Sequence, residues 1–338
     1  MQRWKKRPDG SNWGRFGEDD ERGTLNYIGA SERLAAAREI QEGIAYCLSL
    51  PLDIPGKVSI HPRRKAPRLQ PTFLGDTPYI NYPLDHVDPG LRDVISDDQV
   101  LLSTQYSTQW DSLSHVGALF DVDDNGTLVP CYYNGFRAGT DIEGQTKDGI
   151  HGSYAHHLSV AGMAVAGIQG RGVLVDLVKA FGAGRTIVGL QDLTNVMRAQ
   201  RVELRQGDIL VLHTGYTEAM LAMQDNNPSA AALDHCGAVL DGTDEALLRW
   251  LGDSQIAAIA ADNYAVENPN VDRSCGCFKL PLHHHCLFKL GLPLAELWYL
   301  RDLAEALAAR QRTAFFLTAP PLRLPGAIGS PVTPIATI

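Results

Sequence analysis

The sequence lacks three features that would point to common functional classes. Its six cysteines are scattered and include no CxxC pair, which argues against a zinc knuckle and against a thioredoxin-type redox site. No window holds the roughly 18 to 20 consecutive apolar residues of a membrane-spanning helix. Basic residues are few, because 30 Lys and Arg stand against 39 Asp and Glu, a formal charge of −9. The composition therefore argues against nucleic acid and membrane as partners and favours a small-molecule substrate.

What is present is the composition of an ordinary globular protein. The 338 residues are 44% apolar and 20% charged, which is enough for one large core. The first ten residues are basic, but the apolar stretch of a secretory signal does not follow them. We therefore expect reduced thiols and a cytoplasmic protein.

Proline divides the chain into two unequal parts. Residues 1–96 hold many prolines separated by Gly and Asp, which predicts short strands and loops, with one helix over 31–40 and a strand over 44–50. After this segment, apolar runs bounded by turn residues predict buried strands that alternate with helices. The expected strands are 100–106, 173–177, 209–213, 256–261 and 313–319, and the expected helices are 155–166, 190–200, 244–251 and 303–309.

The order of these elements predicts the fold class. No internal repeat, low-complexity linker or sharp change in composition marks a domain boundary. The chain is therefore expected to be α/β: a single compact domain over residues 1–338, with a mixed β-sheet, packed helices and a loop-rich N-terminal segment of about 96 residues.

A polar segment inside an apolar context, residues 103–115, is the first candidate for a functional site. If this segment is extended, it places Gln105, Ser107, Gln109 and Asp111 on one face, with His115 two steps later. A polar strand edge with satisfied hydrogen bonds would give the same pattern. The loop-like exit after His115 favours a site, because catalytic groups often lie on such loops.

Three consecutive imidazoles, His283, His284 and His285, form the second candidate. They cannot all point the same way, so one or two at most could reach a single centre; hydrogen-bonded residues at a helix start are the alternative. Glu296 follows a short apolar stretch, where an acidic residue needs a partner. A metal or an ion pair with an arginine would supply it, and Arg301 is five residues away, outside the (i, i+4) pairing of a helix.

Residues of a substrate pocket are also predicted. Asp262 and Asn263 follow an expected buried strand, and ligands often contact the carboxyl ends of strands in α/β sheets. Aromatic rings near the polar segment would favour a planar or cyclic substrate, although core packing is their more frequent role. The predicted substrate-contacting residues are Tyr106, Trp110, Tyr133, Asn134, Asp262 and Asn263.

Taken together, these segments resemble the cyclase family of metal-dependent hydrolases, which includes bacterial kynurenine formamidase and isatin hydrolase. The family pattern His-x-Gly-Thr-His-x-Asp-x-Pro-x-His overlays residues 105–115, which here run QYSTQWDSLSH. Further similarity lies at 168–176, 207–215, 281–283 with Glu296, and 319–332. The early segments at 13–14 and 23–26 resemble a longer branch of the family.

The resemblance implies a swivelling β/β/α fold, a homo-oligomer such as a dimer or tetramer, and a bound zinc or manganese ion. It implies Asp111, His283 and Glu296 as metal ligands, with His284 as an alternative to His283. It further implies hydrolysis of a small cyclic or aryl amide, imide, lactam or ester, with His115, beside Asp111, as general acid or base.

The sequence departs from the family pattern at both early histidine ligands. These positions are Gln105 and Gln109, and a neutral amide oxygen binds zinc or manganese more weakly than imidazole does. We therefore expect one divalent cation, completed by a glutamine oxygen and water, or no metal. Without metal, His115 and Asp111 could serve a cyclase, lyase or isomerase by acid–base chemistry. A non-catalytic protein that binds a small molecule in the same pocket is the third hypothesis.

Overall fold

A mixed sheet of nine strands organises the part of the chain that the structure, a computed structural model, describes: residues 2–58, 60–144, 152–224, 229–270 and 278–338. In spatial order the strands are β1 (Ala45–Cys47), β21 (Ile335–Thr337), β19 (Ala314–Thr318), β13 (Gln169–Asp176), β15 (Ile209–His213), β17 (Ala258–Ala261), β18 (Leu294–Glu296), β8 (Gln109–Asp111) and β20 (Gly329–Pro331). The four strands from β13 to β18 run parallel, and the other neighbours pair antiparallel. The predicted mixed sheet is therefore confirmed.

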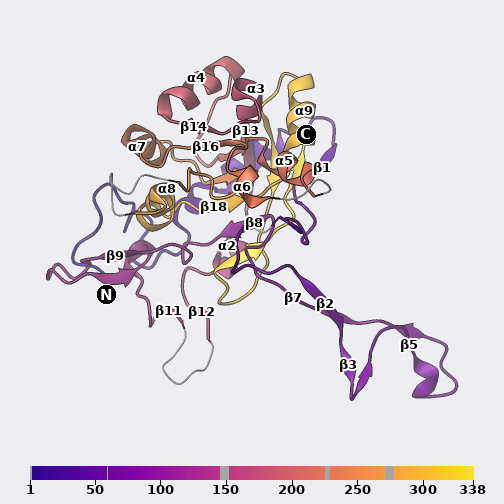
Figure 1. Cartoon of the computed structure of the whole chain (residues 1–338). Helices are drawn as coiled ribbons and strands as arrows, with labels where there is room; N and C mark the ends of the chain where they lie inside the picture. The colour runs from indigo at the N-terminus through magenta and orange to yellow at the C-terminus, as the bar shows by residue number, and fades with distance from the viewer. Residues whose placement is uncertain (1, 59, 145–151, 225–228, 271–277) are drawn as a thin grey trace.

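Helices pack on both faces of this sheet (Figure 1). They are α1 (Ala30–Ala37), α2 (Val160–Ala166), α3 (Leu177–Phe181), α4 (Leu190–Gln200), α5 (Tyr216–Ala222), α6 (Ala230–Leu233), α7 (Glu245–Asp253), α8 (Pro281–His283) and α9 (Arg301–Ala309). Successive residues of β15 alternate between two cores: Leu210 and Leu212 pack with α4 and α7, and Ile209 and Val211 pack with α2 and α9. No helix among the described residues has the length and apolar character needed to cross a membrane.

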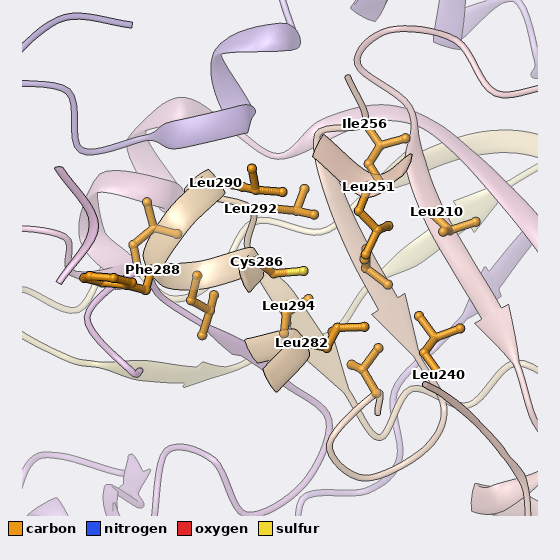
Figure 2. Packing of buried hydrophobic residues seen from close by; sticks show 14 of the residues in the cluster. Leu210, Leu240, Leu251, Ile256, Leu282, Cys286, Phe288, Leu290, Leu292 and Leu294 are labelled. Carbon is orange, nitrogen blue, oxygen red and sulfur yellow. The ribbon is translucent and has the colours of Figure 1, made fainter. Parts of the chain in front are cut away.

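The core on the α7 side holds the segment that carries the three histidines. There α8 leads directly into a π-helix, His284–Leu290, and Leu282, Cys286 and Leu290 pack with Leu251 of α7 (Figure 2). Leu282 is fully buried, and replacement of such a leucine by alanine costs about 2 to 5 kcal/mol. This packing fixes the position of His283, the residue next to Leu282.

Shorter elements surround the sheet. The two-stranded pairs are β9 (Ala118–Phe120) with β10 (Val129–Cys131), β11 (Ile142–Glu143) with β12 (Tyr154–Ala155), and β14 (Thr186–Val188) with β16 (Ala238–Leu240). Two 3-10 helices, Gly23–Tyr27 and Tyr133–Gly135, lie in the connecting segments. These elements close the sides of the two cores.

Residues 68–101 form an arm that projects from the rest of the chain (Figure 1). The arm contains β2 (Arg68–Pro71) paired with β7 (Asp98–Leu101), β3 (Phe73–Leu74) with β4 (Thr77–Pro78), β5 (Tyr82–Pro83) with β6 (Val94–Ile95), and the 3-10 helix Leu84–His86. Its strands are short because proline has no amide hydrogen to donate to a strand ladder. None of the arm residues is buried.

Most expected elements are present, with shifted ends. The strand 209–213 and the helix 190–200 have the predicted bounds, but the helix expected over 155–166 begins at Val160 because β12 precedes it. The strand expected over 100–106 is wrong. Its pairing ends at Leu101, and a turn follows in which the amide of Tyr106 donates to the carbonyl of Ser103 at 3.0 Å. Gln105 therefore does not continue an extended strand to Gln109.

Candidate functional site

Two neighbouring antiparallel strands carry the acidic residues of the candidate site. The pairing of β8 with β18 places Gln109 opposite Glu296 and Asp111 opposite Leu294. Because side chains alternate along a strand, Gln109 and Asp111 share one face of β8, and Trp110 packs into the core on the other. All three residues of β8 are fully buried. The amide of Gln109 and the carboxylate of Asp111 are thus shielded from solvent.

His283 completes a triad with Asp111 and Glu296. Its Nε2 atom lies 3.3 Å from Oε1 of Glu296 and 3.9 Å from Oδ2 of Asp111. One ligand atom from each of the three side chains lies within 4.8 Å of the other two. All three residues are buried. The structure therefore brings together the three residues that the sequence suggested as metal ligands.

Glu267 orients the imidazole of His283. Oε1 of Glu267 accepts hydrogen bonds of 2.8 Å from Nδ1 and from the backbone amide of His283, and Oε2 accepts one of 2.8 Å from the amide of Leu282. Because a carboxylate accepts here, the Nδ1 atom of His283 carries a proton and Nε2 faces the triad. Histidines that bind metals are commonly held by a carboxylate in this way.

Two buried oxygen atoms of the site have no hydrogen-bond partner within the described part of the chain. They are Oδ2 of Asp111 and Oε1 of Gln109. A buried oxygen without a partner costs about 1 to 3 kcal/mol, which indicates that a further group belongs there. Together with Nε2 of His283 and the carboxylate of Glu296, these atoms form a mixed oxygen and nitrogen donor set that suits zinc or manganese. The residues present therefore fit one divalent cation.

The charges at the triad also favour a cation. Burial opposes a charge on His283, but hydrogen bonds with Glu267 and Glu296 outweigh it and raise the pKa of His283 to about 10. Burial raises the pKa of Asp111, which the nearby His115 and His283 only partly offset. Burial also acts to raise the pKa of Glu296, but its hydrogen bond with His283 lowers that pKa overall. Three carboxyl groups thus surround one imidazole; the proton on His283 balances part of their charge when no metal is bound, and a metal at Nε2 would take the place of that proton.

Gln105 connects the triad to His115. Its Nε2 atom donates a hydrogen bond to Oδ1 of Asp111 and lies 3.1 Å from Nδ1 of His115. An amide nitrogen is only a donor, so Nδ1 of His115 accepts and the proton of a neutral ring lies on Nε2. The ring centres of His115 and His283 are 6.4 Å apart. Gln105 therefore holds His115 beside the triad.

Two cavities adjoin the triad. The larger, of about 570 Å³, is lined by His115, His283 and Glu296 together with His61, Arg63, Arg64, Tyr264 and Lys279. The smaller, of about 200 Å³, shares His61, Arg64 and Tyr264 with the first and adds Gln105 and Tyr106. Tyr106 is thus the predicted substrate-contacting residue that lines a cavity at the site.

Three other predicted substrate-contacting residues lie away from these cavities. Trp110 packs edge-on against Trp298 with ring centres 5.6 Å apart, and its indole nitrogen donates to a backbone carbonyl. The hydroxyl of Tyr133 donates to Asp20, and the amide of Asn134 donates to three backbone carbonyls of the N-terminal segment. All three residues are fully buried, and their contacts in the structure are with the protein itself.

Asp262 and Asn263 follow β17 as predicted, but they belong to a different cluster. Asp262 accepts hydrogen bonds from the backbone amides of Thr214 and Gly215 and from the hydroxyl of Thr214. The side-chain amide of Asn263 donates to the carbonyl of Ala238. Neither residue lines the two cavities at the triad. Their contacts fix the loops after β15 and β17.

The other two consecutive histidines turn away from the triad. His284 stacks on Phe288 with ring centres 5.1 Å apart, and burial lowers its pKa to about 3. Burial likewise lowers the pKa of His285 to about 4. Both line another cavity, on the α7 side. Of the three histidines, His283 is the one that faces Asp111 and Glu296.

Comparison with known proteins places this geometry in a family. Residues 48–268 match the family described as "Putative cyclase". A crystal structure described as that of a novel cyclase is 32% identical to this chain, with a TM-score of 0.76, and the match covers 97% of each chain. The chain belongs to the cyclase family.

Isatin hydrolases have the same cyclase-family fold. Isatin hydrolase A from Labrenzia aggregata, bound to benzyl benzoate, is 14% identical with a TM-score of 0.55, and the match covers 91% of this chain and 98% of that one. Isatin hydrolase A from Ralstonia solanacearum is 13% identical with a TM-score of 0.53, and covers 91% and 97%. None of the curated proteins matches this chain. The solved structures confirm the predicted fold class.

Several residues at this cyclase-family site were not predicted. Glu267 lies 16 positions before His283. The one feature of the sequence that could have drawn attention to it is its place directly after two apolar residues, Ala265 and Val266. His61 and Arg64 come from the proline-rich segment, whose path the sequence does not determine. These residues reach the site through tertiary packing, so no local spacing could have revealed them.

Proposed function

We propose that this cyclase-family protein is a hydrolase that cleaves a small cyclic or aryl amide, imide, lactam or ester with one divalent cation, zinc or manganese. Asp111, His283 and Glu296 would hold the cation, and Gln109 would add a neutral oxygen. The observation that carries this proposal is the pair of buried oxygens without partners, Oδ2 of Asp111 and Oε1 of Gln109, next to Nε2 of His283.

Each residue of the site has a role in such a reaction. A cation held by these residues would supply Lewis acidity to polarise a substrate carbonyl and to make water a better nucleophile. Glu267 keeps Nε2 of His283 directed at the triad. His115, held beside the triad by Gln105, would take up the proton released by the attacking water and pass a proton to the leaving nitrogen or oxygen as the C–N or C–O bond breaks. Gln105 also binds Asp111, so it positions the proton donor relative to the metal ligands.

Metal content and hydrolysis, measured together, test this function. Untagged protein is dialysed against chelator and titrated with zinc and manganese, and then assayed with cyclic imides, lactams, aryl formamides and aryl esters. We expect about one metal per chain, and loss of both metal and hydrolysis in Asp111→Asn. The exposed Asp302→Asn is the matched control and should behave like the wild type. Uptake that does not depend on Asp111 would overturn the metal assignment.

A metal-independent cyclase, lyase or isomerase is the second candidate. It is favoured by the two glutamines, Gln105 and Gln109, which replace histidines of the family pattern, and by the contact of His283 with Glu296, which partly closes the triad without a cation. Turnover that survives chelation and is lost in His115→Ala would support this candidate over the hydrolase.

Assembly into a homo-oligomer, a dimer or tetramer, is part of the proposal, and the arm supports it. A two-stranded ribbon alone is marginally stable in water. The arm nevertheless exposes large apolar side chains: Leu69, Phe73, Leu74, Ile80, Val87, Val94, Val100 and Leu101. A surface of this kind is typical of an interface, and a second copy of the chain is the occupant we propose.

Light scattering after size exclusion tests the assembly. The wild type should elute with at least twice the mass of one chain. Leu69→Glu combined with Leu101→Glu puts charge on the apolar surface of the arm and should give a monomer that remains folded, because neither residue packs in a core. Leu34→Glu, an exposed change on α1, is the control. A monomeric wild type would rule out this assembly.

Two further parts of the proposal concern the whole chain. Residues 1–338 act as one cyclase-family domain, which is supported by the pairing of β1 near the beginning with β21 near the end. The location is the cytoplasm, which suits the thiols of Cys47, Cys131, Cys236 and Cys286, all free in the structure. Cys275 and Cys277 lie outside the described residues. Limited proteolysis and cell fractionation test these two points.

A further inference from the structure

Positively charged side chains gather at the cavity beside the triad. Arg63, Arg64 and Lys279 all line the cavity of about 570 Å³ that contains His115 and Glu296. The chain as a whole has a formal charge of −9. The lining of the cavity is therefore rich in positive charge, although the protein as a whole is negative. Such an arrangement attracts an anion.

These cations line the cavity without forming an ion pair to a carboxylate in the described part of the chain. Within the described residues, no Asp or Glu oxygen lies within 4.0 Å of the charged groups of Arg63, Arg64 or Lys279. The guanidinium of Arg63 instead lies 3.3 Å from Nε2 of His61. Burial and then the charges of Arg64, Arg63 and Lys279 lower the pKa of His61, which is consistent with three cations around one opening.

Aromatic rings lie next to the central arginine. Arg64 lines both the larger and the smaller cavity, and Tyr264 lines both with it. Tyr106 adds a second ring to the smaller cavity. Two tyrosine rings beside a guanidinium suit a flat ring that bears a negative group.

We propose that the substrate carries a carboxylate, which Arg64 binds with support from Arg63 and Lys279, while its scissile carbonyl faces the triad. This inference rests on the proposed hydrolase function and names the class of substrate. A guanidinium donates two parallel hydrogen bonds to a carboxylate, so it fixes orientation as well as charge. Arg64 is a positioning and specificity residue in this arrangement, and the triad and His115 act on the carbonyl.

Calorimetric titration with benzoate and benzamide tests the inference directly. The two probes have the same ring and nearly the same shape, but only benzoate is charged. We expect the wild type to bind benzoate at least about tenfold more tightly than benzamide, as for a hydrogen bond to a charged group. Arg64→Gln should bring the two affinities within about twofold of each other, and Arg64→Lys should retain part of the preference.

Three controls separate this effect from others. Arg301→Gln removes an exposed arginine on α9, paired with Glu305, and should keep the wild-type preference. The titrations are repeated after dialysis against chelator, because a carboxylate could also bind a metal. A preference that survives chelation supports the arginines, and a preference that disappears assigns the carboxylate to the metal and overturns the inference. Tighter binding of inorganic phosphate than of benzoate would overturn the choice of a carboxylate.

The outcome can be told apart from that of the proposed function. Stoichiometric metal and hydrolysis of neutral amides, with equal affinity for benzoate and benzamide, would leave the hydrolase intact and reject the carboxylate. A benzoate preference that depends on Arg64, in a protein that binds no metal, would keep the anion site and reject the metal-dependent hydrolase.

Discussion

Two histidine–carboxylate clusters lie near the ends of neighbouring strands of the same sheet, and both have the spacing of a metal site. One contains Asp111, His283 and Glu296, and the other contains His213, Glu218 and Asp262. In each cluster an imidazole lies against a glutamate, at 3.3 Å for His283 with Glu296 and at 2.7 Å for His213 with Glu218. Distance alone does not separate the two.

The second cluster is closed by its own hydrogen bonds. His213 donates from Nδ1 to Asp176 at 3.0 Å and from Nε2 to Glu218 at 2.7 Å. Both oxygens of Asp262 accept hydrogen bonds from the loop that follows β15. Both imidazole nitrogens of His213 and both oxygens of Asp262 therefore have partners. This cluster is an ion-paired structural feature that joins α5 to the sheet.

The first cluster has a buried oxygen that is free to bind a ligand. Oδ2 of Asp111 has no partner in the described part of the chain, and Nε2 of His283 faces the triad because Nδ1 is bound to Glu267. The difference between the clusters is therefore one of unsatisfied donor atoms rather than of residue types or distances.

Matched substitutions of Glu296 and Glu218, one in each cluster, should have the largest effect. If the two variants behaved alike, the distinction between the open and the closed cluster would be wrong. Glu296→Gln removes a charged ligand, so we expect hydrolysis to fall by about a thousandfold and metal uptake to drop well below one per chain. Glu218→Gln keeps an oxygen that accepts from His213 and should leave both within about twofold. Elemental analysis and initial rates measure the pair. Equal loss of metal in both variants would show that the second cluster also binds metal.

The free energy of unfolding should depend more on the second cluster than on the first. His213→Leu leaves the half-buried carboxylates of Asp176 and Glu218 without their cation, and loss of one partner of a buried ion pair costs at most about 3 to 5 kcal/mol. Urea unfolding of metal-free protein at neutral pH measures this loss. His156→Leu, which removes an exposed partner of Glu143, is the control and should change the unfolding free energy by less than about 1 kcal/mol. A wild-type midpoint in His213→Leu would contradict the structural role.

The pH dependence of the unfolding free energy also tests the structural role of His213. Burial opposes the charge of His213, but its hydrogen bonds with Asp176 and Glu218 raise the pKa to about 10, above the ordinary value of 6.5. A raised pKa stabilises the folded state fully below pH 6.5 and loses this contribution as the pH rises through 10. We expect His213 to account for a loss on the order of 3 kcal/mol in the wild type between pH 7 and pH 10. His213→Leu should show a flatter alkaline limb, and parallel curves for the two proteins would contradict the assignment.

Local sequence patterns predicted the helices and strands, but the site is formed by contacts between residues that are far apart in the sequence. The strand 209–213 and the helix 190–200 were predictable because an apolar run and a helical period are contained within each segment. The contact between Gln109 and Glu296 joins residues 187 positions apart, through a strand pairing that no local spacing specifies. The resemblance to a family supplied Asp111, His283 and Glu296 together. Glu267 and the exposed arm became visible only in three dimensions.

Gln109→His should give the smallest effect and tests why the open cluster has an amide where the family pattern has an imidazole. Gln109 is fully buried, with Oε1 unpaired and Nε2 donating to Glu296 at 3.2 Å. An imidazole at this position would add a stronger ligand, so we expect zinc affinity to rise about tenfold, measured by competition with a chromogenic chelator. Gln99→His on the exposed arm is the control, because it adds a histidine far from the triad and should leave the affinity unchanged. An unchanged affinity in Gln109→His would mean that residue 109 does not reach the metal, and that the unpaired oxygen of Gln109 serves the substrate instead.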